Sequence, residues 1–542
     1  MPTSREDVKG LVPLNILVSA LMTDMYQITM SYAYWKAGRH NENAVFDLFF
    51  RKCPFKGQFA IFAGLSEVIA LMNSFTFSPS DIAYLRTVLP RCEEAFFDWL
   101  GQLDCRNVRL YALEEGSLCF PRIPLIRVEG PLAVAQILET PLLNLINYPS
   151  LIATNAARLR LAAGADKTLL EFGLRRAQGP DGALSASRYS YIGGFNGTSN
   201  VLAGKLIGVD IRGTHAHAFV QSYTSFEQIK DPTLDGKDFV AIVKGYRDRP
   251  VCGKVSGSSN DGELAAFTAY AQAFPDGFVA LVDTYDTLQS GVPNFLCVAL
   301  ALDDLGHRAL GCRLDSGDLS YLSQEVRKMT TEAAETFNRS FLATTNIVAS
   351  NDINEESLHY LADQGHAIDT FGIGTNLVTC QAQPALGCVY KLVSIEGVPR
   401  IKLSQTTSKI TIPGRKAVYR LLGADRVPIL DIMLKDGEEP PQPGVPILAS
   451  RHPFVATKRA RVTPTQVVRL QEMVWDGQAG GATSDMPTIH EVRATVAKGL
   501  KEIRQDTLQR LNPTPYKVSV SEGLHDFLHS LWEKEAPIRE LS

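Results

Sequence analysis

The sequence predicts an α/β protein: an irregular (β/α) TIM-like barrel with an additional α+β domain formed from the N- and C-terminal segments. Short apolar runs alternate with amphipathic helical patterns after about residue 150, which is typical of βαβ units and a parallel sheet. Several of these runs end in polar residues, and catalytic groups usually lie where the carboxyl ends of barrel strands gather. We therefore expect an N-terminal α+β part (1–150), a barrel-like catalytic domain (151–390) and a C-terminal part (391–542) that packs with the N-terminal region.

The N-terminal part mixes helical and extended patterns. Residues 67–73 and 93–101 are predicted to be helices, another helix begins at Thr23, and residues 44–50 alternate as a half-buried strand would. A long helical pattern over 144–163 leads into the catalytic domain.

The catalytic domain repeats one unit of strand, polar turn and helix. The first strand, 167–172, leads to Gly173, Arg175 and Arg176, and residues 206–211 are also strand-like. The later expected strands are 279–282, 309–314, 346–349 and 367–371, and the helices between them are 293–305, 320–337 and 355–363. After residue 391 we expect short strands, a surface loop over 437–446 and a helical tail over 489–511.

The composition of the chain excludes several classes of function. The chain has 542 residues, 45% hydrophobic and 21% charged, with a formal net charge of -4, so it is globular and offers no general field for a nucleic-acid backbone. No apolar run reaches membrane-helix length, and the stretch over 11–22 is broken by Pro13. The nine cysteines contain no Cys-x-x-Cys pair and are typical of reduced thiols, so we expect a cytoplasmic protein that binds neither nucleic acid nor membrane.

Two polar strand ends suggest an anion site. The turn Gly372-Ile373-Gly374-Thr375 lets backbone N–H groups approach a phosphate, although a Gly-x-Gly sequence is often only a tight turn. Arg313 and Asp315 lie on one side of an extended chain and suit a substrate with an anionic group. The alternative is a plain ion pair next to a helix cap at Asp318.

The histidine pair in Gly213-Thr214-His215-Ala216-His217 has three interpretations. Two histidines two residues apart on a strand share a face, so a zinc pair is one, but no Cys, Asp or Glu lies nearby in the sequence to complete it. Structural histidines are another, and a nucleophilic or acid–base histidine suited to phosphoryl capture is the third. The glycine stretch over 193–200 opens a helix at Thr198 or Ser199, which is either an anion site or a simple N-cap.

Seven motifs taken together resemble the nicotinate phosphoribosyltransferase family, in order and over essentially the whole chain. They are Thr23-Asp24-Met25-Tyr26-Gln27, Phe172-Gly173-Leu174-Arg175-Arg176-Ala177-Gln178-Gly179, Gly194-Phe195-Asn196-Gly197-Thr198-Ser199-Asn200, Gly213-Thr214-x-Ala216-His217, Val282-Asp283-Thr284-Tyr285-Asp286, Arg313-x-Asp315-Ser316-Gly317-Asp318 and Gly372-x-Gly374-Thr375. The sequence departs from the usual pattern in having His215 before Ala216, and Ala218 where a serine is common.

The resemblance implies a reaction and a set of partners. Nicotinate and 5-phosphoribosyl-1-diphosphate would give nicotinate mononucleotide and diphosphate, with ATP hydrolysis and Mg²⁺ or possibly Mn²⁺, in a cytosolic homodimer with shared active sites, as the first step from nicotinic acid to NAD. The metal ligands are not assigned.

The resemblance also implies residue roles. His217 would be phosphorylated by ATP and, with Asp315 and Arg313, would be catalytic. Nicotinate would be bound by Tyr26 of the neighbouring subunit, Phe172, Ser199, Thr214 and Arg313. Phosphoribosyl diphosphate would be bound by Arg175, Gly317, Gly374 and Thr375, with Asp315 close to the sugar.

Two other functions compete with this one. A phosphate-binding barrel isomerase or aldolase needs a Schiff-base lysine or a carboxylate base at a strand end, and no lysine ends a predicted barrel strand. A non-catalytic ligand-binding relative would be favoured if His217, Arg313 or Asp315 were missing, and all three are present. The choice of nicotinate over nicotinamide rests on Ser199, where the related nicotinamide enzyme has an aspartate that would repel a carboxylate.

Overall fold

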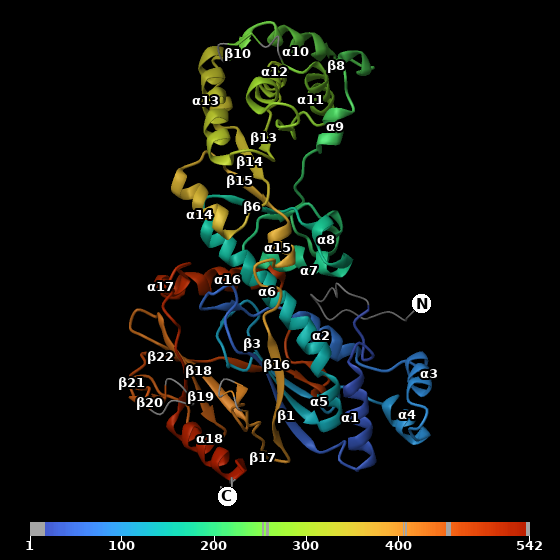
Figure 1. The fold of residues 1–542 in the computed structure, drawn as a ribbon, viewed down its shortest axis with the longest axis vertical. Coiled ribbons are helices and arrows are strands. Elements are labelled where there is room, and N and C mark those ends of the chain that lie inside the picture. The colour runs from blue at the N-terminus through green and yellow to red at the C-terminus, as the bar shows by residue number, and fades with distance from the viewer. Residues whose placement is uncertain are drawn as a thin grey trace, which may run out of the picture. The chain divides into compact units, whose positions relative to one another are not determined.

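The computed structural model describes residues 17–251, 254–255, 259–404, 406, 409–450 and 457–537. The chain divides into two compact units: unit 1 comprises Met1–Asn155 and Ala382–Ser542, and unit 2 comprises Ala156–Gln381 (Figure 1). The first half of the apolar stretch over 11–22, residues 11–16, lies outside the described residues. Among the helices that are described, none combines the length and the apolar character needed to cross a bilayer.

Unit 2 is built on a six-stranded parallel sheet in the order β12-β13-β14-β15-β6-β7, which confirms the predicted α/β class. Its strands are β6 (Thr168–Glu171), β7 (Gly197–Thr198), β12 (Val279–Leu281), β13 (Gly311–Leu314), β14 (Asn346–Ser350) and β15 (Thr370–Ile373). Because all six run in one direction, their carboxyl ends lie along a single edge of the sheet.

The helices of unit 2 connect these strands, and α12 is buried along almost its whole length because it is apolar on every side. They are α7 (Gly179–Ile192), α8 (Val201–Ile207), α9 (His217–Gln221), α10 (Phe239–Arg247), α11 (Asp261–Ala273), α12 (Val292–Asp303), α13 (Leu319–Phe337), α14 (Glu355–Gln364) and α15 (Thr375–Thr379). Two small hairpins, β8 (Thr233–Leu234) with β9 (Lys237–Asp238) and β10 (Pro250–Val251) with β11 (Lys254–Val255), complete it.

The parallel sheet does not close into a continuous barrel in the described part of the chain, because no backbone ladder joins β7 and β12. Ile211 makes one parallel bridge to Thr198 of β7, and the chain then runs on towards β12. The contact with β12 comes from a side chain, since the Leu281 backbone N–H donates to Nε2 of His215 at 3.3 Å. The segment that carries His215 therefore reaches β12 through a side chain and not through a backbone ladder.

Unit 1 contains two larger sheets and a two-stranded ladder. A seven-stranded antiparallel sheet has the order β17-β16-β1-β5-β3-β23-β24, a six-stranded mixed sheet has the order β21-β20-β25-β19-β18-β22, and β2 pairs with β4. The strands are β1 (Asn43–Phe50), β2 (Ala60–Ile61), β3 (Arg109–Leu113), β4 (Leu118–Cys119), β5 (Ile126–Pro131), β16 (Cys388–Ile395), β17 (Val398–Pro399), β18 (Lys416–Leu422), β19 (Pro428–Lys435), β20 (Ile447–Ser450), β21 (Arg459–Val462), β22 (Gln466–Arg469), β23 (Gln471–Asp476), β24 (Gly481–Ala482) and β25 (Val518–Ser521).

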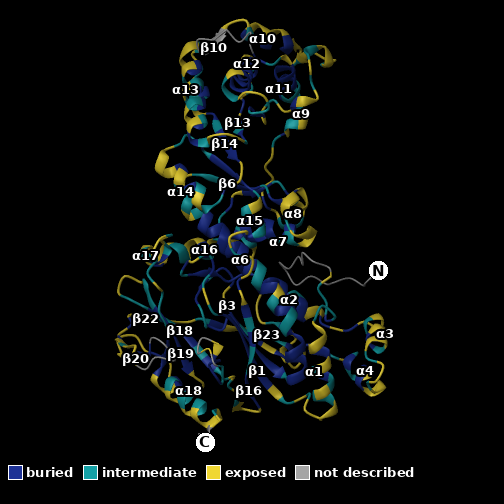
Figure 2. Ribbon diagram, in the orientation of Figure 1, coloured by how far each residue is buried: buried dark blue, intermediate teal, exposed yellow. Residues whose placement is uncertain are grey.

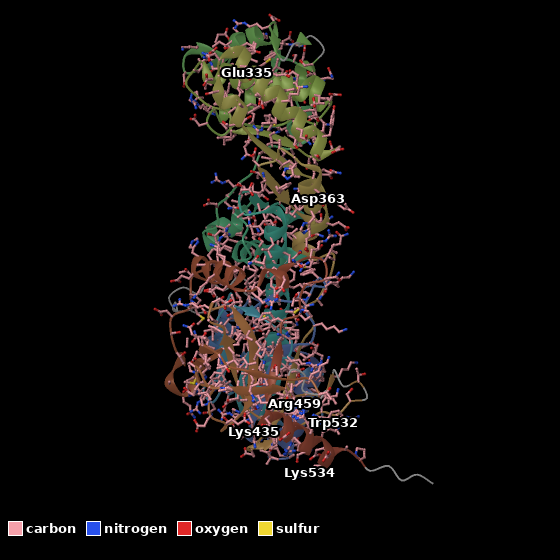
Figure 3. The ribbon with its side chains drawn as sticks, turned by 90° about the vertical axis from the view of Figure 1, so that its left-hand side faces the viewer. Glu335, Asp363, Lys435, Arg459, Trp532 and Lys534 are labelled. Atoms are coloured by element: carbon pink, nitrogen blue, oxygen red, sulfur yellow. The ribbon has the colours of Figure 1, made fainter. Side chains whose placement is uncertain are left out.

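The strands of these sheets are largely buried, whereas several outer helices are exposed (Figure 2). The helices are α1 (Met25–Lys36), α2 (Leu65–Ser74), α3 (Pro79–Val88), α4 (Glu94–Leu100), α5 (Leu132–Ile137), α6 (Glu139–Ala163, which continues into unit 2), α16 (Ile489–Glu502), α17 (Gln505–Leu508) and α18 (Glu522–Glu535). Helix α18 packs on the six-stranded sheet. Lys435 at the end of β19 has its Nζ 4.6 Å from the ring centre of Phe527 of α18. Figure 3 labels Lys435 and also Trp532, which belongs to α18.

Four predictions about local structure are wrong. Residues 44–50 are not half-buried, because β1 lies in the middle of its sheet and Asp47 pairs with Lys416 of the other sheet at 2.7 Å. Residues 206–211 are not a strand, since α8 runs to Ile207 and ends at Gly208 with φ of 73°. The glycine stretch opens its helix at Asn200, whose side chain accepts from the Ala203 N–H, and the helical tail over 489–511 breaks after Glu502.

Candidate active site

The strand ends of unit 2 enclose a polar cavity of about 170 Å³. It brings together six residues predicted from the sequence, namely Phe172, Arg175, Arg313, Asp315, Gly374 and Thr375. Residues not predicted as site residues complete the lining: Arg176, Ser350, Asn351, Asp352, Ile353, Gly372 and Asn376. Strand ends from β6, β13, β14 and β15 thus meet around one space, as parallel strands require.

Arg313 and Asp315 are joined both directly and through a serine. Arg313 Nη2 lies 3.2 Å from Asp315 Oδ1, and Arg313 Nε donates to Ser350 Oγ at 2.8 Å. Ser350 Oγ in turn donates to Asp315 Oδ1 at 2.6 Å. Arg313 Nη1 also donates to Thr214 Oγ1 at 3.4 Å. These bonds fix the guanidinium in the cavity wall and still leave N–H groups for an anionic ligand.

His217 lies beside this pair. Its Nε2 is 3.8 Å from Asp315 Oδ2, and its Nδ1 is 3.0 Å from Thr284 Oγ1, on the loop that follows β12. The same loop also holds the backbone at Asp315, because Asp283 Oδ2 accepts from the Asp315 N–H at 3.1 Å and from Ser316 Oγ at 2.5 Å. One loop therefore positions both the imidazole and the carboxylate.

The other histidine, His215, has a structural role. It is 8% exposed, lies among aromatic rings including Phe219 and Tyr270, and accepts the Leu281 N–H. Burial lowers the pKa of His215 to about 4, so the ring is neutral at physiological pH. Within the described residues no group of three or more His, Cys, Asp or Glu side chains could hold a metal, which gives no support to the zinc interpretation.

A close-packed aromatic ring forms one wall of the cavity. The Arg313 guanidinium carbon lies 5.6 Å from the ring centre of Phe172. A Cβ on Gly372 would lie 2.6 Å from Cε2 of this ring, so only glycine permits the ring to lie against β15. The turn after Phe172 is held by the buried carboxylate of Glu171, which accepts from the Gly173 N–H, from Ser187 Oγ at 2.8 Å and from Thr198 Oγ1 at 2.5 Å.

Five predicted site residues are not among those that line the cavity. Two of them, His217 and Thr214, contact its lining residues Asp315 and Arg313, and the other three are Ser199, Gly317 and Tyr26. Ser199 follows β7, and its Oγ donates to the Glu171 carbonyl at 3.4 Å. Gly317, with φ of 78°, forms the turn before Asp318, which caps α13 by accepting the Tyr321 N–H at 3.0 Å. Tyr26 belongs to unit 1, where it is 47% exposed on α1, so it is not the packing residue that helical position alone would suggest.

Ser350, Asp352, Asp283 and Glu171 were not predicted from the sequence as individual site residues. Each of the first three follows or ends a predicted strand, so its position carried a signal. Their single polar side chains nevertheless resemble ordinary turn residues until the neighbouring strands are aligned. Glu171 is 0% exposed in an apolar run, and nothing in its sequence neighbours indicated that three donors would surround it.

The cavity can accept a divalent cation only with help from a ligand. Asp315 and Asp352 are the two carboxylates in its lining. Mg²⁺ is commonly held by one or two carboxylates together with substrate phosphates and water. The donor set therefore fits magnesium bound with a phosphorylated substrate.

Taken together, a parallel sheet whose strand ends carry arginines, a glycine turn and carboxylates defines an enzyme for a phosphorylated substrate. Family models for the nicotinate phosphoribosyltransferase (NAPRTase) N-terminal domain, family and C-terminal domain match residues 21–147, 168–423 and 415–528. The chain belongs to the nicotinate phosphoribosyltransferase family and is an enzyme of that family.

Relatives match over their whole length. Nicotinate phosphoribosyltransferase 1 of Arabidopsis thaliana is 53% identical, over 98% of this chain and 96% of its own. The human nicotinate phosphoribosyltransferase is 47% identical, over 95% and 97%. The crystal structure of human nicotinic acid phosphoribosyltransferase superposes with a TM-score of 0.85 at 45% identity, covering 94% of this chain and 99% of that one.

Proposed function

We propose that this enzyme joins nicotinate to 5-phosphoribosyl-1-diphosphate, giving nicotinate mononucleotide and diphosphate on the route to NAD, with ATP hydrolysis coupled through a phosphohistidine at His217. The observation that supports it best is the Phe172 ring, 5.6 Å from the Arg313 guanidinium, at the edge of a cavity closed by the glycine turn at Gly372 and Gly374. An aromatic face with a cation beside it suits a flat aromatic carboxylate.

The chain's residues would position nicotinate rather than activate it. The pyridine ring stacks on Phe172 while its carboxylate takes N–H groups of Arg313, with Thr214 beside them. The ring nitrogen is neutral and carries a lone pair, so it attacks the anomeric carbon without a general base. Alignment of the two reactants supplies the rate.

The phosphoribosyl end would lie at Arg175, Gly374 and Thr375. As the bond from the anomeric carbon to diphosphate breaks, its electron pair goes to the leaving oxygen and positive charge develops on the sugar. Asp315 favours that positive charge, and the arginines favour the departing anion. Asp315 and Asp352, together with the substrate, would hold Mg²⁺, which would neutralise further charge on diphosphate.

His217 is the residue proposed to take a phosphoryl group from ATP. Nδ1 of His217 is hydrogen-bonded to Thr284 Oγ1 at 3.0 Å. This leaves Nε2 of His217, which faces Asp315, as the nucleophile. Nε2 forms a bond to the γ-phosphorus while the bond to the ADP oxygen breaks, and ADP leaves. The phosphoryl group is later transferred to water.

Shared active sites in a homodimer, in the cytosol, complete the proposal. Tyr26 is exposed on α1 and would stack on the nicotinate bound by the other subunit. Unit 1 also has a cavity of about 330 Å³ lined by four cations and no acid: Arg51, Arg122, Lys458 and Lys517. Phosphoribosyl diphosphate carries several negative charges, and the cavity at Asp315 is lined by both cations and carboxylates. Cations supplied by a second subunit would therefore add positive charge for the substrate.

Substrate assays test the reaction. The full chain is incubated with nicotinate, nicotinamide or quinolinate, each with phosphoribosyl diphosphate and Mg²⁺, with and without ATP, and the mononucleotide and diphosphate are quantified. We expect nicotinate mononucleotide to be the main product, with more formed when ATP is present. Product from quinolinate or nicotinamide alone would refute the assignment.

Phosphohistidine mapping tests the role of His217. Mass spectrometry under mildly basic conditions is expected to detect the modification in the wild type and in His215→Ala, but not in His217→Ala. A label retained in His217→Ala would move the phosphorylation site elsewhere.

Hybrid dimers test the shared site. Inactive Tyr26→Ala and Arg313→Ala subunits, mixed under conditions where subunit exchange is demonstrated, should recover part of the activity because one of the two sites is then intact. No recovery after exchange would indicate that each subunit holds a complete site.

A further inference from the structure

A buried polar cluster lies behind the loop that carries Thr284. Glu263 of α11 is 0% exposed, and its Oε2 accepts from Ser290 Oγ at 2.5 Å and from Asn294 Nδ2 at 2.9 Å. Asn260 ties in both partners, because its N–H donates to Ser290 Oγ at 2.9 Å and its carbonyl accepts from Asn294 Nδ2 at 3.1 Å. The start of α11 is thereby fixed to the start of α12.

This cluster holds the far end of the loop over 283–286. Residues Thr287–Gly291 form a π-helix, a feature often found at functional sites, and Asp286 caps it by accepting the Gln289 N–H at 2.7 Å. Gly291 packs so closely on the end of β12 that a Cβ would lie 2.6 Å from the Val282 carbonyl carbon. Both ends of the loop are therefore anchored, one at Val282 and the other through Ser290 to Glu263.

Side chains of the anchored loop contact the active-site residues. Its Thr284 Oγ1 contacts His217 Nδ1 at 3.0 Å, and its Asp283 accepts from the Asp315 N–H and from Ser316 Oγ. Glu263 is in the protein interior and does not line the cavity. Its influence on His217 and Asp315 therefore passes through the loop.

We propose that Glu263 is a positioning residue: through Ser290 and Asn294 it fixes the loop whose Thr284 and Asp283 orient His217 and Asp315. The proposal rests on the roles proposed above for those two residues. A buried acceptor that leaves two donors unsatisfied when removed is costly, and the loop would shift to recover hydrogen bonds. A shift of about 1 Å in a reacting group can lower a rate about 100-fold.

The carboxyl group changes its charge close to neutral pH. Burial is the main reason why the pKa of Glu263 is raised to about 7; the hydrogen bonds from Ser290 and Asn294 act to lower it, and the negative charges of Asp283 and Asp286 act to raise it. As pH rises above 7, the ionised carboxylate repels the loop that it supports. Between its ordinary pKa near 4.5 and about 7 the folded chain binds a proton that the unfolded chain has lost, so stability falls as pH rises across that window.

Two variants of the full chain separate these effects. Glu263→Gln keeps an acceptor for Ser290 and Asn294 without a titrating charge. We expect its kcat to match that of the wild type at pH 6.5. It should lose both the fall in melting temperature that the wild type shows between about pH 4.5 and 7 and the fall in kcat as the carboxyl group ionises around pH 7. Glu263→Ala removes the acceptor, and kcat should fall about 10- to 100-fold at every pH while KM for nicotinate changes little, because Phe172 and Arg313 stand on other strands.

Matched controls keep the test decisive. Glu335→Gln and Glu335→Ala change an exposed glutamate on α13 of the same unit (Figure 3) and should alter neither profile. A folded Glu263→Ala with wild-type kcat, or a Glu263→Gln as impaired as Glu263→Ala, overturns the proposal. The rate without ATP and the labelling of His217→Ala are measured alongside, so a failure of the phosphohistidine assignment is recognised separately from a failure at Glu263.

Discussion

The contact between Gly372 and Phe172 makes Gly372→Ala an informative perturbation. The added methyl carbon would lie 2.6 Å from Cε2 of the Phe172 ring and closer still to Cδ2. Carbon atoms in favourable contact are about 3.5–4.0 Å apart, so the ring must withdraw by about 1 Å. Overpacking of this kind costs about 1–3 kcal/mol of folding free energy. A misplacement of about 1 Å can lower kcat/KM for nicotinate about 100-fold.

Steady-state kinetics and thermal unfolding measure the two effects together. We expect Gly372→Ala to fold with a lower melting temperature and to lose most of its kcat/KM through a raised KM for nicotinate. Gly245→Ala is the matched control, because a Cβ there meets no heavy atom within 4 Å on the exposed side of α10. That variant should be as active as the wild type and slightly more stable, by about 0.5–1 kcal/mol. A folded Gly372→Ala with an unchanged KM for nicotinate would refute the stacking role of Phe172.

Three further substitutions address the cavity, its specificity and unit 1. Ser350→Ala removes the hydroxyl that bonds Asp315 at 2.6 Å, and since hydrogen bonds to charged groups are worth about 1.5–3 kcal/mol, kcat/KM should fall about 10- to 100-fold with little change in melting temperature. Ser199→Asp adds a negative charge beside Glu171, just before Phe172 in the chain but outside the cavity lining, so the ratio of kcat/KM for nicotinate to that for nicotinamide should fall; an unaltered ratio would show that Ser199 does not sense the carboxylate. Asp431→Asn removes a fully buried carboxylate that pairs with the largely buried Arg420 at 2.8 and 2.9 Å, and chemical denaturation should report a loss of about 3–5 kcal/mol.

The sequence predicted the parallel sheet of unit 2 because its strands are short apolar runs bounded by polar turns. The runs before Asp283, Asp315 and Gly372 all became strands in the expected order. The same pattern brought Arg313, Asp315 and the glycine turn to one cavity. Local periodicity and turn chemistry carry this information, since neighbouring βαβ units align their strand ends.

Features that depend on distant partners were not predictable in this way. Burial of Asp47 within β1 depends on Lys416, more than 300 residues away, and a charged residue in an alternating run looked like an exposed position. The hydrogen bonds of Ser350 and Glu171 depend on side chains from other strands. The segment over 206–211 contains apolar residues that fit a strand, but the Asn200 cap and the left-handed Gly208 fix a helix that ends before it.

Unit 1 is formed by two stretches of the chain, one before and one after unit 2, and this fixes the order in which the two units can be completed during synthesis on the ribosome. Strand β1 pairs with β16 on one side and β5 on the other, yet Phe50 and its partner Cys388 are separated by more than 300 residues of chain. At about 5–20 residues per second, β1 waits some tens of seconds for that neighbour. All six strands of the parallel sheet in unit 2 leave the ribosome within that interval. We therefore expect unit 2 to fold first during synthesis, while the early strands of unit 1 offer an unpaired apolar edge to chaperones.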